Sequence, residues 1–413
     1  MPNHLVIAGA CVRQHVQSAQ RAGFDTVGID LFADSDTRDS GTSLKAKSTG
    51  EIPKLLREQV RQYWCLAGGL ERHVAQLTDD HISGKLLGSS PAALELASDF
   101  PRWSTTIKGA KLISPEHSRQ QRCPPGHWLR KPLHSSGGYN IAWTERGRPR
   151  DKETYFQQWT PGRTLGATYV TIGQQTELIG VTLQLSGHDI GRDQHPFAYA
   201  GSIGPLQLKP ELQSRIRQIG NQIGQSIPCK GVWGADLISH QEKLTLVDIN
   251  PRLTSSCDIH ERAHSNLSIV GLHTNACLAL STKKTIDQLL QSPRIGLGKA
   301  IAFSPSGQPI EIKPSDNKRF CTQKLTKYSG AISDIPLTGT IIPPQGPICT
   351  AYETEQNTTL TFDSSDKELT AGIQRILDRL RRRIHEIIEP WQSESKSFPD
   401  ANRESSRPIS QSG

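Results

Sequence analysis

The order of apolar and polar residues predicts a parallel α/β domain at the N-terminus. Residues 4–10, HLVIAGA, are typical of a buried strand, and residues 12–23 continue with the apolar spacing of a helix. A second strand is predicted at residues 25–32, and residues 66–73 contain the end of a further strand with a glycine turn. Because a strand, a helix and a strand follow one another, we expect a parallel sheet in this first part of the chain.

The middle of the chain has a different pattern, with short strands separated by turns. Residues 128–141 predict a hairpin with a Ser-Ser-Gly-Gly tip, and residues 155–172 predict two strands around a Pro-Gly turn. Residues 178–185 continue the sheet, and a helix is expected at 210–225. Two adjacent strands follow at 231–239 and 243–250, and then one helix from about residue 259 to 280.

The C-terminal part alternates short strands with Pro and Gly from residue 298 to 362, which predicts a small β-rich unit. A last helix closes this unit. Its apolar residues keep helical spacing, so the arginines of RILDRLRRRIH, residues 375–385, are expected on its solvated face. Almost nothing apolar follows Trp391, and residues 392–413 are therefore expected to be disordered.

Composition narrows the class of protein. The chain has 413 residues, 35% of them apolar, and a net charge of +8. It contains no apolar run long enough to span a membrane, and the short N-terminal run lacks the preceding basic residues of a secretory signal. Its eight cysteines are scattered and form no C-x-x-C pair, which favours the reducing cytoplasm. The dense basic run at residues 375–385 is explained as the solvated face of a helix. We therefore predict neither a nucleic-acid nor a membrane partner.

Lys131 stands on a predicted strand directly before Ser135, Ser136, Gly137 and Gly138. A cation beside a glycine loop, whose backbone N–H groups can approach a ligand closely, is suited to binding phosphates. Ser-Gly-Gly sequences also form ordinary turns, so this feature alone is a weak signal.

A second set of polar residues interrupts the two strands at 231–239 and 243–250. Asp236 and Asp248 are twelve residues apart, a spacing that brings them together on neighbouring antiparallel strands. Asn250 lies two residues after Asp248 and therefore on the same strand face. Two carboxylates and an amide oxygen are hard ligands of the kind that Mg²⁺ prefers. Arg252 follows, and its guanidinium would hold a carboxylate or stabilise transferred charge.

Together these residues resemble the ATP-grasp superfamily over about residues 1–285. The motifs are RKPLHSSGG at 130–138, QQWTPG at 157–162, and GADLIS followed by LVDINPR at 234–239 and 246–252. The resemblance implies that Lys131 and the glycine loop bind the phosphates of ATP, and that Asp236, Asp248 and Asn250 hold Mg²⁺ or Mn²⁺, as two ions. It also implies that Arg252 lies beside the reacting group, and it places the nucleotide base at a hinge made of Gln157, Gln158, Trp159 and Thr160.

The sequence departs from the family pattern at the hinge and at Asp248. Gln157 and Gln158 occupy the hinge where the family usually has Glu, and Asp248 stands where Glu is frequent. The resemblance implies an α/β ATP-grasp fold with an N-terminal parallel α/β domain at 1–98, a flap at 99–164 and an antiparallel α+β ATP-binding subdomain with the metal site at 165–290. A β-rich C-terminal unit at 291–391, similar to that of biotin-carboxylase-like proteins, and the tail at 392–413 complete the expected organisation.

The resemblance implies an ATP-dependent ligase that activates a carboxylate as an acyl-phosphate and joins it to an amine. Its expected partners are small molecules, with a second copy of the chain and a setting in cofactor biosynthesis as further hypotheses. A non-catalytic ATP-binding regulatory module is the first alternative, because the hinge departs from the family.

The second alternative is a zinc hydrolase, because HERAH at 260–264 fits the H-E-x-x-H pattern with His260 and His264 as ligands and Glu261 as base. No acidic residue lies between Arg262 and Lys284 to serve as a third ligand. We therefore expect polar residues on a helix beside the active site, with His260 and Arg262 as candidates for substrate contact.

Overall fold

The computed structural model describes seven stretches of the chain, residues 4–78, 82–107, 112–264, 267–291, 295–322, 331–363 and 368–392. The tail predicted at 392–413 lies outside these residues except for Gln392. No helix within the described stretches is both long and apolar enough to cross a membrane.

The N-terminal part is a five-stranded parallel sheet in the order β3-β2-β1-β4-β5, as the repeated strand–helix pattern predicts. Its strands are β1 (His4–Ala8), β2 (Asp25–Asp30), β3 (Thr42–Lys45), β4 (Tyr63–Leu66) and β5 (Lys85–Leu86). Its helices are α1 (Arg13–Arg21), α2 (Ser35–Arg38), α3 (Ile52–Gln59) and the 3-10 helix η1 (Glu71–Gln76). Helices α4 (Pro91–Ser98) and α5 (Phe100–Thr106) lead out of it.

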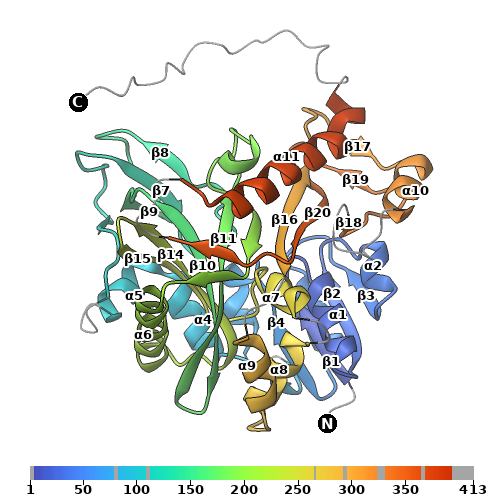
Figure 1. The fold of residues 1–413 in the computed structure, drawn as a ribbon, viewed down its shortest axis with the longest axis horizontal. Coiled ribbons are helices and arrows are strands. Elements are labelled where there is room, and N and C mark those ends of the chain that lie inside the picture. The colour runs from blue at the N-terminus through green and yellow to red at the C-terminus, as the bar shows by residue number, and fades with distance from the viewer. Residues whose placement is uncertain are drawn as a thin grey trace.

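A separate antiparallel sheet of four strands forms the predicted flap, in the order β6-β9-β7-β8. Its strands are β6 (His117–Ser118), β7 (Trp128–Pro132), β8 (Ala142–Thr144) and β9 (Thr154–Gln158). Figure 1 shows this sheet at the opposite side of the molecule from β1 and α1. The predicted hairpin at 128–141 is β7 and β8, which pair antiparallel around the glycine loop.

The central sheet has eight antiparallel strands in the order β15-β14-β10-β11-β12-β16-β20-β18. Its strands are β10 (Arg163–Ile172), β11 (Gln175–Ser186), β12 (Tyr199–Gly204), β14 (Gly231–His240), β15 (Lys243–Asn250), β16 (Ile295–Phe303), β18 (Ala331–Ser333) and β20 (Pro347–Gln356). The strands β16, β20 and β18 of the predicted C-terminal unit therefore continue the same sheet. Where the chain divides into domains stays a prediction.

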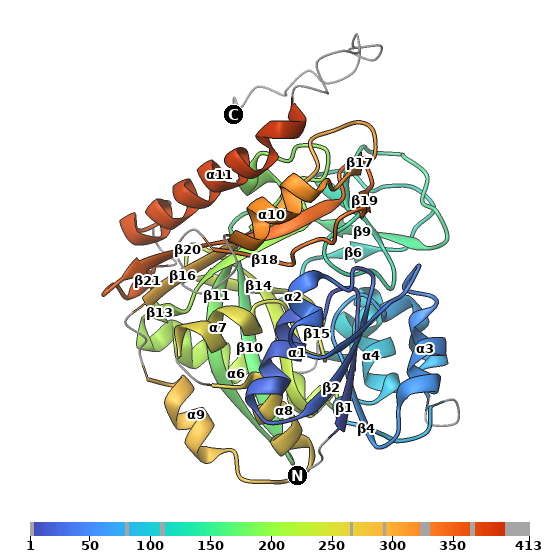
Figure 2. The same cartoon turned by 90° about the vertical axis from the view of Figure 1, so that its right-hand side faces the viewer.

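The remaining elements surround this sheet. They are η3 (His188–Ile190), β13 (Leu206–Leu208) with β21 (Leu360–Phe362), β17 (Ile310–Glu311) with β19 (Ile341–Ile342), and the helices α6 (Pro210–Ser226), α9 (Lys283–Leu289), α10 (Pro314–Thr322) and α11 (Ala371–Gln392). In Figure 2, α11 lies across the outer face of β16 and β20, on the far side from the N-terminal sheet. Helix α10 interrupts the segment that we predicted as purely β.

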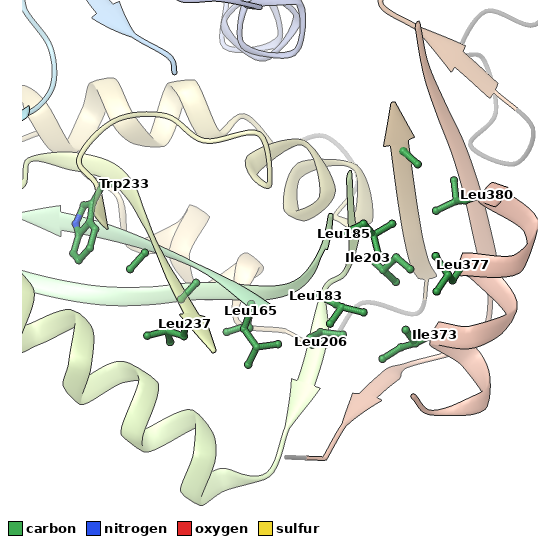
Figure 3. Packing of buried hydrophobic residues seen from close by; sticks show 14 of the residues in the cluster. Leu165, Leu183, Leu185, Ile203, Leu206, Trp233, Leu237, Ile373, Leu377 and Leu380 are labelled. Carbon is green, nitrogen blue, oxygen red and sulfur yellow. The ribbon is translucent and has the colours of Figure 1, made fainter. Parts of the chain in front are cut away.

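Apolar side chains spaced three or four residues apart fix α11 to the central sheet. Figure 3 shows Ile373, Leu377 and Leu380 directed toward the buried residues of β11 and β12. Gly298 permits this close packing, because a Cβ there would lie 2.3 Å from Ile376 Cγ2. Arg381 and Arg382 are exposed, as predicted for the solvated face.

The single helix predicted from 259 to 280 is wrong. The structure has α7 (Cys257–Ala263), which ends at His264 in an extended conformation, and α8 (Ile269–Cys277), which begins after Ser268. Ser268 caps α8 by accepting a hydrogen bond from Gly271 N at 2.8 Å. A serine that satisfies the first N–H groups of a helix starts a new helix, and apolar periodicity alone does not reveal this break.

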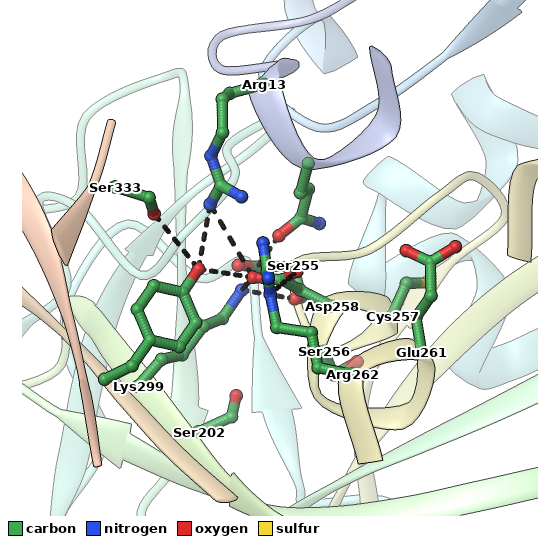
Figure 4. A network of polar contacts seen from close by, with 12 residues as sticks. Arg13, Ser202, Ser255, Ser256, Cys257, Asp258, Glu261, Arg262, Lys299 and Ser333 are labelled. Atoms are coloured by element: carbon green, nitrogen blue, oxygen red, sulfur yellow. Dashed lines mark hydrogen bonds and ion pairs between the residues drawn. The ribbon is translucent and has the colours of Figure 1, made fainter. Parts of the chain in front are cut away.

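A buried network of charges ties the N-terminal sheet to the central sheet (Figure 4). Asp258 of α7 pairs with Arg262 at 2.6 Å, with Lys299 of β16 at 3.4 Å and with Arg13 of α1 at 3.6 Å. Arg13 also pairs with Asp334 at 2.9 Å. Burial disfavours the Asp258 carboxylate, but Arg262, Lys299 and Arg13 outweigh it and hold the pKa of Asp258 well below its usual value. The network therefore stabilises the arrangement of the domains only while Asp258 is ionised.

We predict that Asp258→Asn lowers the free energy of unfolding by about 3–5 kcal/mol, because it leaves buried cations without their counter-charge. The pKa of Asp258 is lowered by folding, so its contribution is present above the unfolded pKa and is lost as the pH falls through the folded pKa. Urea denaturation at pH 7 measures the loss. Asp378→Asn is the control, because Asp378 makes exposed contacts with Arg381 and Gln374, and it should change stability by less than about 0.5 kcal/mol. Equal effects of the two variants would contradict a stabilising network.

Candidate active site

One large cavity, of about 830 Å³, lies where the N-terminal sheet, the flap and the central sheet meet. Its walls include Lys131 from the flap, Asp236 and Asp248 from the central sheet, and Ala10 and Gly68 from the N-terminal part. Lys131, Asp236 and Asp248 lie on strands of the flap and the central sheet, and Ala10 and Gly68 lie in loops that follow strands of the N-terminal sheet. The cavity therefore exists only when all three parts are assembled.

Asp236 and Asp248 are direct register partners on β14 and β15, as the twelve-residue spacing predicted. The pairing shifts between Asp236 and Leu237, which leaves Val247 as an extra residue beside the cavity. Burial and the Asp248 charge raise the pKa of Asp236 to about 7. Burial likewise raises the pKa of Asp248, while Lys131 and Arg252 oppose the increase. Two partly buried like charges face each other, so a cation between them would be stabilising.

Asn250 lies on the same face of β15 as Asp248, and its Nδ2 donates to Asp248 Oδ2 at 3.3 Å and to Asp236 Oδ2 at 3.4 Å. Its Oδ1 accepts a hydrogen bond from Arg252 Nη2 at 2.7 Å. In this orientation the amide oxygen points toward Arg252 and away from the carboxylates. The role of Asn250 as a metal ligand stays a prediction, and it requires the amide to turn over.

Arg252 reaches the cavity because the strand ends abruptly at Pro251. Arg252 N donates to Asn250 O at 2.7 Å, a tight three-residue turn that redirects the chain. The guanidinium is 10% exposed and pairs with Glu71 Oε1 at 2.8 Å. It lies flat against Gly68, where a Cβ would be 2.9 Å from Arg252 Cζ. Glu71 and Gly68 therefore fix the position of this guanidinium, and sequence reasoning identified neither residue.

Lys131 points into the cavity from β7, and its Nζ donates to Gln157 Oε1 at 3.1 Å. Burial lowers the pKa of Lys131, and the charges of Asp248 and Asp236 counteract part of that effect. Because these carboxylates are the groups that affect its charge, the lysine and the carboxylate pair share one electrostatic environment. Gln157 belongs to the same wall, as the hinge hypothesis expects.

The other hinge residues lie elsewhere. Gln158 is exposed, and Trp159 is 41% exposed with its ring 5.5 Å from that of Trp143. Gln158, Trp159 and Thr160 are absent from the residues that line the cavity. The alternation of side chains along β9 places Gln157 inside and Gln158 outside.

The glycine loop covers one side of the cavity, with Ser135, Ser136, Gly137 and Gly138 all in its lining. Gly137 and Gly138 have φ of 67° and 70°, and a Cβ on Gly138 would lie 2.2 Å from Phe197 O. These positions therefore require glycine. The loop is docked on the central sheet, because Tyr199 N donates to Gly137 O at 2.8 Å.

Two further residues of the cavity wall carry polar groups that the sequence did not reveal. Gln184 Nε2 donates to Asp236 Oδ1 at 2.6 Å and so fixes that carboxylate. Arg192 is buried, with its guanidinium 3.8 Å from the centre of the Phe303 ring and Nη2 donating to Gln345 O at 2.6 Å. No short sequence motif connects either residue to the site, because each comes from a distant part of the chain.

The zinc hypothesis fails on geometry. His264 lies beyond the end of α7 and bonds to the carbonyls of His260 and Gln291. Glu261 is paired with Arg21 at 2.6 Å and accepts from Ile269 N at 2.8 Å. Across the described residues, no group of three or more His, Cys, Asp or Glu side chains is arranged to hold a metal.

His260 is fully buried against Gly180, where a Cβ would lie 2.3 Å from His260 Cε1, and burial lowers its pKa to about 3. Arg262 is engaged with Asp258. Neither His260 nor Arg262 lines the cavity. Both residues therefore lie outside the cavity, and the predicted substrate contact is wrong for them.

Residues 98–256, which contain Lys131, the glycine loop and the carboxylate pair, match the family model described as an ATP-grasp domain. The chain contains an ATP-grasp domain. This match confirms the resemblance to the ATP-grasp superfamily that the sequence motifs indicated. No curated protein matches the sequence.

Solved structures with the same fold extend beyond the ATP-grasp domain. N5-carboxyaminoimidazole ribonucleotide synthetase from Thermotoga maritima is 14% identical, with a TM-score of 0.58 over 92% of this chain and 97% of that chain. The biotin carboxylase domain of the 2-oxoglutarate carboxylase from Hydrogenobacter thermophilus is 12% identical, with a TM-score of 0.65 over 86% and 87%. L-amino acid ligase from Bacillus licheniformis is 11% identical, with a TM-score of 0.61 over 86% and 94%. At these identities, the likeness confirms the predicted fold, including its N-terminal and C-terminal parts.

The carboxylate pair has the chemistry of a site for a divalent cation. Asp236 and Asp248 offer hard oxygen ligands, and burial together with the Asp248 charge raises the pKa of Asp236, so a bound cation would favour its ionised form. Two protein carboxylates suit Mg²⁺, which usually completes its coordination with water and phosphate oxygens. The residues therefore fit the metal that the family implies.

We predict that Gly68→Ala displaces the Arg252 guanidinium and leaves the fold intact, because the crowded atoms are the end of a flexible side chain. A displacement of about 1 Å at a reacting group can lower the rate by up to about 100-fold. The measurement is ADP formation with substrate, together with the melting temperature. Gly50→Ala is the matched control, since a Cβ there has no neighbour closer than 3.4 Å. If the two variants keep equal rates, the position of the guanidinium does not matter for turnover.

Proposed function

We propose that the protein is an ATP-dependent ligase that activates a carboxylate as an acyl-phosphate and couples it to an amine. The observation that carries this proposal is the convergence of Lys131, Arg252 and the Asp236–Asp248 pair on one cavity beneath a glycine loop. This combination places cations and metal ligands around a single space, as transfer of a phosphoryl group requires. The shared fold with known ligases supports the same reading.

ATP would bind with its phosphates between Lys131 and the glycine loop. The loop offers backbone N–H groups at Gly137 and Gly138, whose positive φ and missing side chains permit close approach. Gln157, beside Lys131, is the hinge residue within the cavity. Several structural neighbours are described in complex with ADP or ATP, which supports a nucleotide here.

Asp236 and Asp248 would hold Mg²⁺ or Mn²⁺, with Asn250 as the further ligand if its amide turns, and we propose two ions. Bound divalent cations supply neutralisation of phosphate charge, worth several kcal/mol in a phosphoryl transfer. Gln184 and Asn250 hold the carboxylates in place by hydrogen bonds to Asp236 and Asp248. The protein therefore prepares this site before the nucleotide arrives.

The reaction would proceed in two steps. A substrate carboxylate oxygen bonds to the γ-phosphorus of ATP while the bond to the ADP oxygen breaks. The amine nitrogen then bonds to the acyl carbon, inorganic phosphate leaves, and the amine loses a proton. Arg252, fixed by Glu71 and Gly68, would donate hydrogen bonds to the acyl-phosphate and its developing oxyanion. The docked glycine loop would keep water from hydrolysing the intermediate.

The setting of this activity is part of the proposal. We propose a cytoplasmic enzyme for small-molecule substrates, with a role in cofactor biosynthesis and a homo-oligomeric state as further hypotheses. Eight free cysteines agree with a reducing compartment.

We predict that MgATP raises the melting temperature of the parent protein and that Lys131→Ala reduces this shift. A ligand at 100 times its Kd adds about 2.7 kcal/mol to the stability of the folded state, and losing a phosphate contact weakens the binding. Thermal unfolding at a series of ATP concentrations measures the effect. The control is Lys152→Ala, because Lys152 is exposed on the same flap. A parent protein without any shift would disprove nucleotide binding.

We predict that Asp248→Asn lowers turnover on the order of 100-fold or more, because it removes a metal-binding charge worth several kcal/mol to the transition state. ADP formation is measured with MgATP and a panel of carboxylates and amines. Asp193→Asn serves as the control, since Asp193 is exposed.

Stability provides an independent readout for the same variant. The folded state raises the pKa of Asp248, so the parent protein loses stability as the pH rises through that pKa. Asp248→Asn, measured without metal, does not undergo this loss. Its melting temperature at pH 8 should equal or exceed that of the parent. Parent-like turnover would falsify the ligase proposal, and ATP binding without any turnover in the parent would favour the regulatory module instead.

A further inference from the structure

Asp34 is a buried carboxylate without a partner. It lies in the loop between β2 and α2, is 6% exposed, and belongs to the wall of the cavity. Within the described part of the chain, its side chain makes no hydrogen bond and no ion pair, and it does not cap α2. Burying an ionised carboxylate in this way is unfavourable unless something else neutralises it.

The neighbouring carboxylates are satisfied. Asp30 accepts hydrogen bonds from Val12 N at 3.0 Å and from Ala33 N at 2.7 Å. Asp36 accepts from Asp334 N at 2.9 Å and from Ile335 N at 3.0 Å. These bonds hold the loop and the C-terminal segment together. Their roles are structural, which sets Asp34 apart.

The nearest cation is already engaged elsewhere. Arg13 pairs with Asp334 at 2.9 Å and with Asp258 at 3.6 Å. Burial raises the pKa of Asp34 well above its usual value, the charges of Asp334, Asp36 and Asp30 raise it further, and Arg13 only partly opposes them. Cys11, whose Sγ lies 3.6 Å from Asp334 Oδ1, is the other titratable group beside this wall. This end of the cavity therefore carries surplus negative charge.

Asp34 is connected to the reaction centre by a short stretch of cavity wall. Gly68, which packs against the Arg252 guanidinium, accepts a hydrogen bond from Ala10 N at 2.7 Å. Ala10 in turn accepts from Leu31 N at 3.2 Å, three residues before Asp34. The loops after β4, β1 and β2 thus form one continuous surface at the carboxyl end of the parallel sheet, where ligands bind in such folds. A substrate held at Arg252 can extend along it.

We propose that a substrate of this enzyme carries a cationic nitrogen group, an ammonium or a guanidinium, which binds to Asp34. This inference rests on the proposed ligase function, because it assigns the same cavity to the substrates. An organic cation fits better than a metal ion, since Asp34 offers one free carboxylate, and its neighbours Asp30 and Asp36 are occupied by hydrogen bonds from backbone N–H groups. A charge-assisted hydrogen bond in a buried site gives strong discrimination against a neutral isostere.

The test compares matched pairs of probes in which one member has a single cationic nitrogen group and the other has none: methylguanidine with methylurea, and butylamine with butanol. Thermal shifts without ATP measure binding to the parent protein and to Asp34→Asn. We expect the parent to prefer each cationic probe by about tenfold or more, and the variant to bind both members of a pair alike. Asp25→Asn, on exposed Asp25 at the start of β2, is the control and should behave like the parent.

A second readout tests whether Asp34 has a structural role. Because the folded state raises its pKa, parent stability falls as the pH rises through that pKa, and Asp34→Asn removes this loss. The variant should melt at or above the parent temperature, with a larger gain at pH 8 than at pH 5. A variant that is destabilised or unfolded would reveal a structural partner and overturn the proposal.

The two proposals fail in different ways. The MgATP shift is recorded on the same samples, and it should be unchanged in Asp34→Asn. If the MgATP shift is present but neither cationic probe is preferred by the parent, the Asp34 proposal is wrong and the ligase proposal stands. If MgATP does not shift the melting temperature of the parent protein, the ligase proposal fails. The proposal that this cavity is the substrate site of a ligase then fails as well.

Discussion

The mutual repulsion of Asp236 and Asp248 is the constraint on which the site depends. Antiparallel pairing of β14 and β15 puts the two carboxylates directly opposite each other in a buried position. The surrounding protein offsets this repulsion only in part, through Lys131, Arg252 and the amides of Gln184 and Asn250. Such an arrangement would be stabilised by a bound cation, and this agrees with the proposed metal site.

The assembly of three sheets around the cavity depends on a second, compensated set of charges. Asp258 brings together cations from α1, α7 and β16, and Arg13 links them to Asp334 near β18. This network is neutralised internally, whereas the cavity is not. The contrast separates carboxylates with structural partners from carboxylates available for ligands: Asp36 and Asp30, which accept backbone hydrogen bonds, belong to the first kind, and Asp34 belongs to the second.

Close backbone approach is the other requirement of the site. Gly68 gives room to the Arg252 guanidinium, and Gly138 lets the flap loop contact the chain at Phe197. A side chain at either position would collide with atoms that define the cavity. These glycines connect the N-terminal sheet and the flap to the same reaction centre, so the geometry of the site is shared among parts of the chain that fold into separate sheets.

The sequence by itself determined the elements and the paired carboxylates, because strand alternation, helical spacing and turn residues are local, and because twelve residues between Asp236 and Asp248 allow one hairpin register. It also indicated Lys131 and the glycine loop. It did not reveal the break after α7, since the Ser268 cap competes with an uninterrupted apolar pattern. Only the tertiary structure decided that Glu71 holds Arg252. It also decided that Gln184 reaches Asp236 and that Gln158 turns away from the cavity. The lack of a partner for Asp34 among the described residues is likewise visible only there. Those contacts depend on the order and packing of three sheets. They join residues that are distant in sequence, and no local pattern predicts such contacts.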